Sequence, residues 1–155
     1  MNEEKSIVAR VDIDASRERV WEMLCDVGRY AEWVESTLKV TRSDGPAQLG
    51  GTYEEVTRVS GPWKTTTRWR VVKFEPLVRQ EHSGEGVVTA QDMAVIMELS
   101  DVGDKTHLEL VIRYAPRFGV VGRMIDAAVE GSLRRAQQRS AEAFARLVVR
   151  ESSSR

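Results

Sequence analysis

The sequence contains very little cysteine and histidine. Cys25 is the single cysteine among 155 residues, and His82 and His107 are the only histidines. One thiol can form neither an internal disulfide nor a zinc centre that needs several thiolates, so we expect Cys25 to be a small buried residue on a helix. The two histidines fall on different expected strands, with no patterned carboxylates around them. We therefore expect no metal site and no cofactor.

A basic excess, long apolar runs and a targeting signal are also lacking. The formal net charge is -1, whereas a general nucleic-acid binder needs a basic surface, so we expect no nucleic-acid partner. No stretch approaches the roughly 18 consecutive apolar residues of a membrane-spanning helix. The first residues, MNEEKSIVARVDID, are acidic where a signal peptide is basic. These absences predict a cytoplasmic protein without an integral membrane segment.

The short motifs of common catalytic sites are missing as well. The sequence has no G-x-x-x-x-G-K-S/T, no G-x-G-x-x-G after a strand, no G-x-S-x-G and no H-E-x-x-H, which excludes the usual nucleotide, hydrolase and metalloprotease signatures. Glu54, Glu55 and Glu81 could in principle act as bases, but carboxylates on strands are usually solvated. The residues alone therefore identify no catalytic group.

The composition that is present describes one ordinary globular domain. Hydrophobic residues make up 41% of the chain and charged residues 30%, and the length is close to that of a single domain. No internal repeat, low-complexity block or linker divides the sequence. We expect one domain over residues 1–150 and a frayed tail over 151–155. A monomer and a homodimer are both compatible with these features.

The period of the apolar residues changes along the chain. It is 2 over residues 6–14, as in a strand with one buried face, and 3.6 from Ser16 on, which predicts helices over 16–25 and 28–35. Turn residues then separate extended segments, in the manner of an antiparallel meander. The further strands are expected near residues 37–43, 52–59, 63–74, 77–83, 88–100 and 105–115.

Residues 118–149 are expected to form one long helix, because they contain no proline and their apolar residues recur at helical spacing. Seven strands would expose a large apolar sheet face, and only this helix is long enough to cover it. The predicted fold class is therefore α+β, with a seven-stranded antiparallel sheet against a long C-terminal helix and two short helices between the first and second strands.

Three segments carry a resemblance to a known family. They are IDASRERVWEMLCDVGRYAEWVE, WRVVKFEPLVRQ and THLELVIRYAP, in this order. Together they resemble the START-like superfamily and, within it, the SRPBCC or polyketide cyclase/dehydrase-like branch. The resemblance covers nearly the whole chain and implies a helix-grip fold, in which a curved sheet wraps around the C-terminal helix and leaves a cavity for a lipid, polyketide, sterol or quinone-type molecule. It implies no reaction, because one fold serves carriers, sensors and enzymes.

Strand alternation assigns the candidate ligand-binding residues to the inner face of the sheet. Packing of a solid core is the competing role for each of them. The inner-face candidates are Thr67, Trp69, Val71, Val95, Met97, Leu108, Leu110, Ile112 and Tyr114.

Four further candidates come from small and polar residues. Ala128 and Ser132 belong to a run of small residues in the long helix, which would leave room where a solid core would have Leu or Phe. Gln80 and His82 stand where the family usually has apolar residues. If these two face inward, they provide the pocket with polar groups that can orient a ligand.

Three functions are compatible with these residues. The leading hypothesis is a non-catalytic binder or carrier of an apolar small molecule. The alternative is a polyketide aromatase/cyclase or dehydratase that uses the same cavity, with Tyr114 or His82 moving a proton. The third is a co-chaperone-like module that binds protein through its rim. A cavity group with a shifted pKa would favour the enzyme, and a large exposed apolar patch would favour the protein binder.

Overall fold

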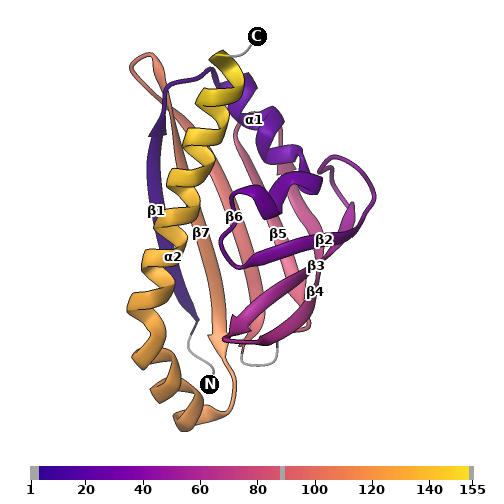
Figure 1. Ribbon diagram of the computed structural model, residues 1–155, viewed down its shortest axis with the longest axis vertical. Coiled ribbons are helices and arrows are strands. Elements are labelled where there is room, and N and C mark those ends of the chain that lie inside the picture. The colour runs from indigo at the N-terminus through magenta and orange to yellow at the C-terminus, as the bar shows by residue number, and fades with distance from the viewer. Residues whose placement is uncertain (1–3, 88–89, 154–155) are drawn as a thin grey trace.

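The computed structural model describes residues 4–87 and 90–153. Figure 1 shows a long helix beside one curved sheet, with two shorter helical segments near one end. The order of elements is the expected one of an α+β domain. The elements are β1 (Lys5–Ile13), α1 (Arg17–Cys25), η1 (Val27–Glu32), β2 (Thr37–Ser43), β3 (Thr52–Ser60), β4 (Trp63–Glu75), β5 (Arg79–Glu85), β6 (Ala90–Val102), β7 (Lys105–Pro116) and α2 (Gly119–Ser153).

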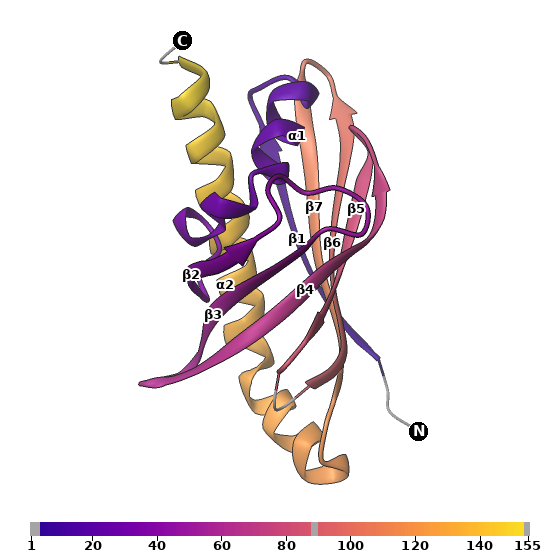
Figure 2. The ribbon, with the colours of Figure 1, turned by 90° about the vertical axis from the view of Figure 1, so that its right-hand side faces the viewer.

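All seven strands pair antiparallel in one sheet, in the order β1-β7-β6-β5-β4-β3-β2. The first strand lies beside the last, from Lys5 opposite Tyr114 to Ile13 opposite Thr106. The register shifts within β2–β3, β3–β4, β4–β5 and β6–β7. Such irregularities bend strands and increase twist, and the sheet in Figure 2 curves around α2. The prediction of a curved seven-stranded antiparallel sheet is confirmed.

One strand begins later than expected, and the start of another falls at the edge of the described residues. β5 starts at Arg79 rather than at residue 77, because Leu77 has a φ of 67° and belongs to the turn that precedes the strand. β6 starts at Ala90, and the expected strand residues 88 and 89 lie outside the described residues.

Local hydrogen bonds set the bounds of the two short helices. The side chain of Ser16 accepts a hydrogen bond from the backbone of Arg19, which caps α1. The second segment, η1, is a 3-10 helix that ends at Glu32, earlier than the expected residue 35. The backbone N–H of Trp33 bonds to the carbonyl of Tyr30, three residues back, and this tighter turn closes the segment.

The C-terminal half of α2 packs against the core. Phe144, Leu147 and Val148 are buried, and the ring of Phe144 lies against Trp33 with centroids 4.7 Å apart. The helix continues to Ser153, beyond the expected end at residue 149. Glu151 forms an ion pair with Arg29 at 2.6 Å, and fraying of residues 151–155 stays a prediction.

Contacts with β1 and β7 hold the N-terminal half of α2. Lys5 of β1 forms ion pairs with Asp126 and Glu130. Tyr114 of β7 donates a hydrogen bond to Asp126 Oδ1 at 2.5 Å. These contacts tie the start of the helix to β1 and β7, on the side of the molecule away from β3 and β4 (Figure 1).

A chain of polar side chains is buried in the core. Tyr53 Oη lies 2.6 Å from His82 Nδ1, and His82 Nε2 lies 2.7 Å from Gln80 Oε1. Because an amide oxygen only accepts, His82 Nε2 carries the proton and Nδ1 accepts from the Tyr53 hydroxyl. Gln80 in turn donates to Cys25 Sγ at 3.7 Å. Burial lowers the pKa of His82 to about 4, so the imidazole is neutral at pH 7.

Gly84 makes room for an aromatic side chain on the inner face. It lies opposite Trp69 in the β4–β5 pair, and a Cβ atom at Gly84 would come within 2.5 Å of the Trp69 ring. The ring cannot shift freely, because it stacks on Tyr53 at an interplanar angle of 18° and donates to Glu55. Glycine is therefore required here by close approach.

We predict that Gly84→Ala lowers the free energy of unfolding by about 1 to 3 kcal/mol, because the added methyl group overpacks against Trp69. Gly28→Ala is the matched control, since its Cβ would meet only Asp26 Oδ1, at 3.9 Å. Urea midpoints of both variants test this. Equal midpoints for the two variants would contradict the close packing.

We predict that His82 makes the fold less stable in acid. The unfolded chain protonates a histidine near pH 6.5 and the folded chain only near pH 4, so the unfolded state binds more protons between these values. Stability should therefore fall as the pH drops from about 6.5 to about 4, by about 3 kcal/mol for this group. Urea midpoints at pH 7, 6 and 5 should fall less steeply for His82→Gln than for the wild type. Identical slopes for the two proteins would contradict the assignment.

Candidate functional site

Part of the inner face of the sheet is covered incompletely. On β7, Leu108 and Leu110 are buried while Ile112 is half-buried, and on β6, Met97 is buried while Val95 is half-buried. The apolar side chain of Leu133 on α2 is 40% exposed. Further along β7, Tyr114 is buried again. The incomplete cover is therefore confined to the region around Val95 and Ile112.

A cleft of about 60 Å³ lies where the covered part of this face ends. Side chains from η1, β3, β4, β6, β7 and α2, together with the segment after η1, form its walls. Most of them are aromatic or aliphatic. The lining residues are Tyr30, Trp33, Val34, Tyr53, Glu55, Trp69, Val95, Met97, Leu110, Ile112, Gln137 and Ser140.

Glu55 is the one carboxyl group among these lining residues. Its side chain is buried, and it accepts hydrogen bonds from Trp69 Nε1 at 2.9 Å and from the Thr37 hydroxyl at 3.0 Å. Burial raises the pKa of Glu55, and the bonds from Thr37 and Trp69 partly offset that effect. Each carboxyl oxygen uses one lone pair in these bonds and keeps another. The group can therefore still accept a hydrogen bond from a bound molecule.

Trp33 adds an unused donor to the cleft. Its side chain is buried, and among the described residues no group accepts a hydrogen bond from its Nε1. A buried N–H without a partner costs free energy. Gln137 donates to the Leu110 carbonyl and Ser140 accepts from the Glu35 backbone, and each keeps further hydrogen-bonding capacity. Trp33 differs from them, because its one donor has no partner among the described residues.

The structure brings part of the predicted set to the cleft. Thr67, Val71 and Leu108 are buried but are not among its lining residues. The predicted residues that line it are Trp69, Val95, Met97, Leu110 and Ile112.

Gln80, His82 and Tyr114 do not reach the cleft. Gln80 and His82 are completely buried, and their ring and amide groups bond to each other and to Tyr53, which separates them from the cleft. Tyr114 belongs to a smaller apolar cluster and bonds to Asp126. The structure gives these three residues packing and anchoring contacts rather than free polar groups.

The expectation that Ala128 and Ser132 face the sheet is wrong. Both residues are exposed. The buried positions Asp126 and Gln137 define the inner side of this part of α2, and successive residues of a helix are rotated by about 100°. Ala128 therefore lies almost opposite Asp126, and small residues at 128 and 132 do not border the cavity.

Sequence reasoning did not name Tyr53, and it named Glu55 only as a possible base that was expected to be solvated, whereas both side chains are buried on β3. Their positions follow the alternation of that strand, with Tyr53 and Glu55 buried and Glu54 between them on the other face. Two adjacent glutamates on a strand point to opposite faces, so one of them points inward. This signal was available in the sequence, whereas the approach of Trp33 from η1 was not, since it depends on tertiary packing.

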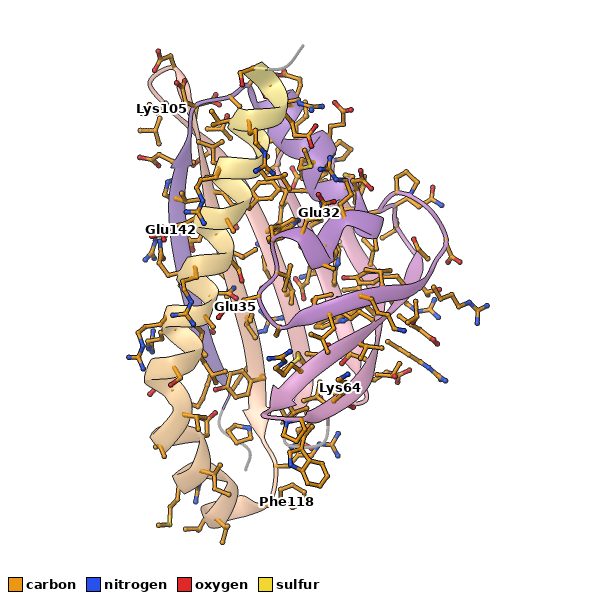
Figure 3. All side chains as sticks on the ribbon, in the orientation of Figure 1. Glu32, Glu35, Lys64, Lys105, Phe118 and Glu142 are labelled. Atoms are coloured by element: carbon orange, nitrogen blue, oxygen red, sulfur yellow. The ribbon has the colours of Figure 1, made fainter. Side chains whose placement is uncertain are left out.

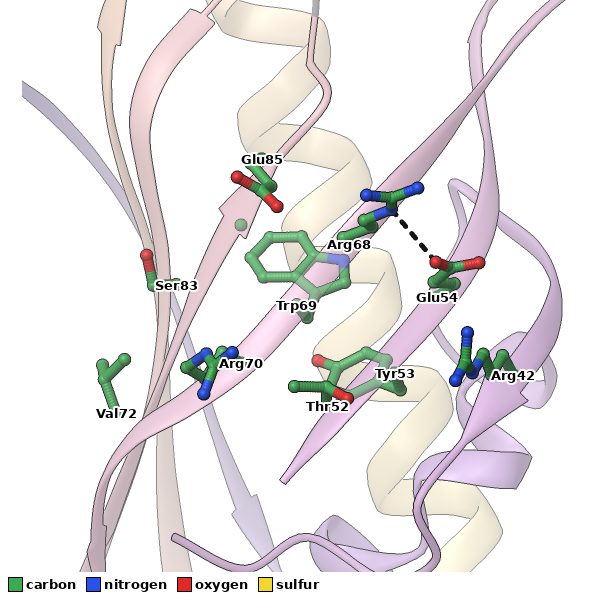
Figure 4. A pocket seen from close by; sticks show the side chains of 11 residues that line it. Arg42, Thr52, Tyr53, Glu54, Arg68, Trp69, Arg70, Val72, Ser83 and Glu85 are labelled. Atoms are coloured by element: carbon green, nitrogen blue, oxygen red, sulfur yellow. Dashed lines mark ion pairs between the residues drawn. The ribbon is translucent and has the colours of Figure 1, made fainter. Parts of the chain in front are cut away.

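A second cleft, of about 560 Å³, shares Tyr53 and Trp69 with the first and is otherwise lined by residues of β2, β3, β4 and β5. Figure 4 shows its charged walls, including the ion pair of Arg68 with Glu54 at 3.0 Å. It is larger than the inner cleft, but its walls are exposed and charged, with the Arg68 side chain 69% exposed. Such walls do not suit an apolar molecule, so we favour the inner cleft. The lining residues are Arg42, Thr52, Tyr53, Glu54, Arg68, Trp69, Arg70, Val72, Ser83, Gly84 and Glu85.

The described part of the chain holds neither a metal-binding cluster nor a membrane-spanning helix. Within residues 4–87 and 90–153, no three His, Cys, Asp or Glu side chains are placed to hold a metal ion. Over the same ranges, no helix is both long and apolar enough to cross a membrane.

Several solved structures share this fold. The TTHA0849 protein from Thermus thermophilus is 15% identical, with a TM-score of 0.79, over 96% of this chain and 99% of that one. The Zhui aromatase/cyclase from Streptomyces sp. R1128 is 20% identical, with a TM-score of 0.71, over 94% and 96%. Ara h 8.0201 is 6% identical, with a TM-score of 0.68, over 95% and 99%. At these identities the likeness shows the fold alone.

Sequence comparison identifies the family. No curated protein is significantly similar to this chain. The profile of one family, described as "Polyketide cyclase / dehydrase and lipid transport", matches residues 4–149. This range includes all seven strands and nearly all of α2. The chain therefore belongs to the polyketide cyclase/dehydrase and lipid transport family.

Proposed function

We propose that this protein binds an apolar small molecule, of the lipid, polyketide, sterol or quinone type, between its sheet and α2, with the polar end of the molecule at Glu55 and Trp33. The observation that carries the proposal is the buried carboxyl group of Glu55 at the end of an otherwise apolar, partly uncovered sheet face. A few polar groups within an apolar cleft are the ordinary form of a small-molecule site.

The polar groups define the chemistry of the ligand. Glu55 keeps lone pairs that accept, and Trp33 keeps an N–H that donates. A hydroxyl group or a hydroxyl beside a carbonyl fits both. A ligand carboxylate fits poorly, because it would place a second negative charge near Glu55.

The rest of the ligand would lie along the uncovered apolar face. The cleft is small beside ordinary pockets of roughly 300 to 1,000 Å³. A bound molecule would therefore extend from Glu55 past Ile112 and Val95 toward Leu133, whose side chains are half-buried or exposed. Each Å² of apolar surface that the ligand removes from water should contribute about 25 cal/mol of favourable binding free energy.

A cyclase or dehydratase activity is the second candidate, and Glu55 is the observation that favours it. A buried carboxyl group with a raised pKa can take a proton from an enolisable carbon or return one to an oxygen. His82 and Tyr114 are less suited to this role, since their polar atoms are already bonded. The Glu55→Gln variant distinguishes the two functions. If the protein is an enzyme, this variant should still bind the substrate but no longer convert it.

We predict that Val95→Phe weakens binding of an apolar naphthalene probe at least tenfold, because the larger side chain fills the open space of the cleft. The free energy of unfolding should stay within about 1 kcal/mol of the wild-type value, because the added ring displaces no other side chain. Val111→Phe is the matched control, since Val111 is also half-buried but lies on the other face of β7, the strand next to β6. Titrations followed by tryptophan fluorescence give the affinities, and urea midpoints give the stabilities. Equal affinities for the two variants would place the ligand elsewhere.

We predict that the protein binds 2-naphthol more tightly than 2-methoxynaphthalene, because only the hydroxyl group donates to Glu55. The Glu55→Gln variant should lose most of this preference, about tenfold, since a hydrogen bond to a carboxylate is stronger than one to a neutral amide. Glu54→Gln, on the opposite face of the same strand, should keep it. A preference for 2-naphthol that survives in Glu55→Gln would remove Glu55 from the site.

A further inference from the structure

Two segments at one end of the molecule expose apolar side chains to solvent. One is the tip of the β3–β4 hairpin, residues 58–64, where Trp63 is 73% exposed. The other, residues 117–125, leads into α2, and its Phe118 and Met124 are 67% and 68% exposed. Together the two segments hold seven of the thirteen large apolar side chains that are exposed in the described part of the chain.

Both segments carry positive charge and no negative charge. Residues 58–64 read RVSGPWK and residues 117–125 read RFGVVGRMI, each with two basic residues and no Asp or Glu. The chain as a whole has a formal net charge of -1, so the positive charge is local. Apolar side chains interspersed with arginine and lysine fit an anionic lipid surface, which takes the apolar groups below its headgroups and pairs the cations with phosphates.

The two segments lie toward the same end of the molecule. The hairpin tip and the start of α2 occupy the lower half of both Figure 1 and Figure 2, away from α1. Figure 3 labels Lys64 and Phe118, one from each segment, at this end. The half-buried inner residues Val95 and Ile112 lie in the middle of β6 and β7, and the cleft that they line meets α2 at Gln137 and Ser140. One flat surface can therefore touch both segments at this end of the molecule.

We propose that residues 58–64 and 117–125 dock this end of the molecule on an anionic phospholipid bilayer. A second copy of the chain is the poorer occupant, because it would bring the arginines of one molecule against those of the other. Docking would let an apolar ligand pass between the bilayer and the cavity without crossing water. The proposal does not depend on the identity of that ligand, or on Glu55.

Vesicle binding followed by fluorescence tests the proposal. Trp63 is the exposed tryptophan, while Trp21, Trp33 and Trp69 are buried, so a blue shift on binding reports Trp63. We expect a blue shift and co-flotation with vesicles of phosphatidylglycerol and phosphatidylcholine, and little of either with phosphatidylcholine alone. A rise from about 0.05 to about 0.5 M NaCl should weaken binding at least tenfold, because salt screens the arginines and lysine.

Two double variants locate the docking surface. Trp63→Ser with Met124→Ser should weaken vesicle binding at least tenfold, while Leu49→Ser with Val102→Ser, also exposed but elsewhere, should leave it unchanged. Unaltered thermal midpoints show that both variants fold. No binding to anionic vesicles, equal loss in both variants, or a blue shift that follows concentration-dependent dimerisation without lipid would each overturn the proposal. Loss of naphthol binding in the absence of vesicles is a separate result and bears on the ligand site alone.

Discussion

A sheet of seven strands is wider than the single helix that packs on it, and the rest of this structure depends on that mismatch. Neighbouring strands lie about 4.8 Å apart, so seven span about 29 Å, whereas a helix with its side chains is about 10 Å across. Helix α2 can cover about a third of the inner face. α1 and η1 cover more of it at one end, where Trp21 packs on Phe74 and Trp33 on Phe144. Around Val95 and Ile112 the inner face is only half-buried, and the cleft lies there.

The polar groups of the inner face divide into two sets with different consequences. Gln80, His82 and Tyr53 bond to one another and hold a fixed arrangement behind the wall of the cleft. Glu55 and Trp33 line the cleft and keep unused hydrogen-bonding capacity. A carboxyl group taken out of water destabilises a fold unless its partners compensate, and an apolar residue would serve packing better. In Glu55, the bonds from Thr37 and Trp69 provide part of that compensation.

The fold could be predicted largely from the sequence, because the change from period 2 to period 3.6 and the recurrent turns are local signals. The inner positions Trp69, Met97 and Leu110 followed from alternation alone. The face of α2 could not be predicted in the same way, because both its small residues and its apolar residues recur at helical spacing. The bonds of Asp126 to Lys5 and Tyr114 decide its rotation. Lys5 and Asp126 lie more than a hundred positions apart in the sequence. The position of Tyr114 beside Asp126 depends on how β7 pairs in the sheet. No local sequence pattern contains either relation.

Occupation of the inner cleft by the ligand is the central claim, and nuclear magnetic resonance of the isotope-labelled protein during titration with 2-naphthol tests it most directly. We predict that the indole N–H signals of Trp33 and Trp69 shift together with the methyl signals of Val95 and Ile112. Signals of Val72 and Ser83, beside the outer cleft, should stay in place. Shifts confined to Val72 and Ser83, or no saturable shift at all, would contradict binding in the inner cleft.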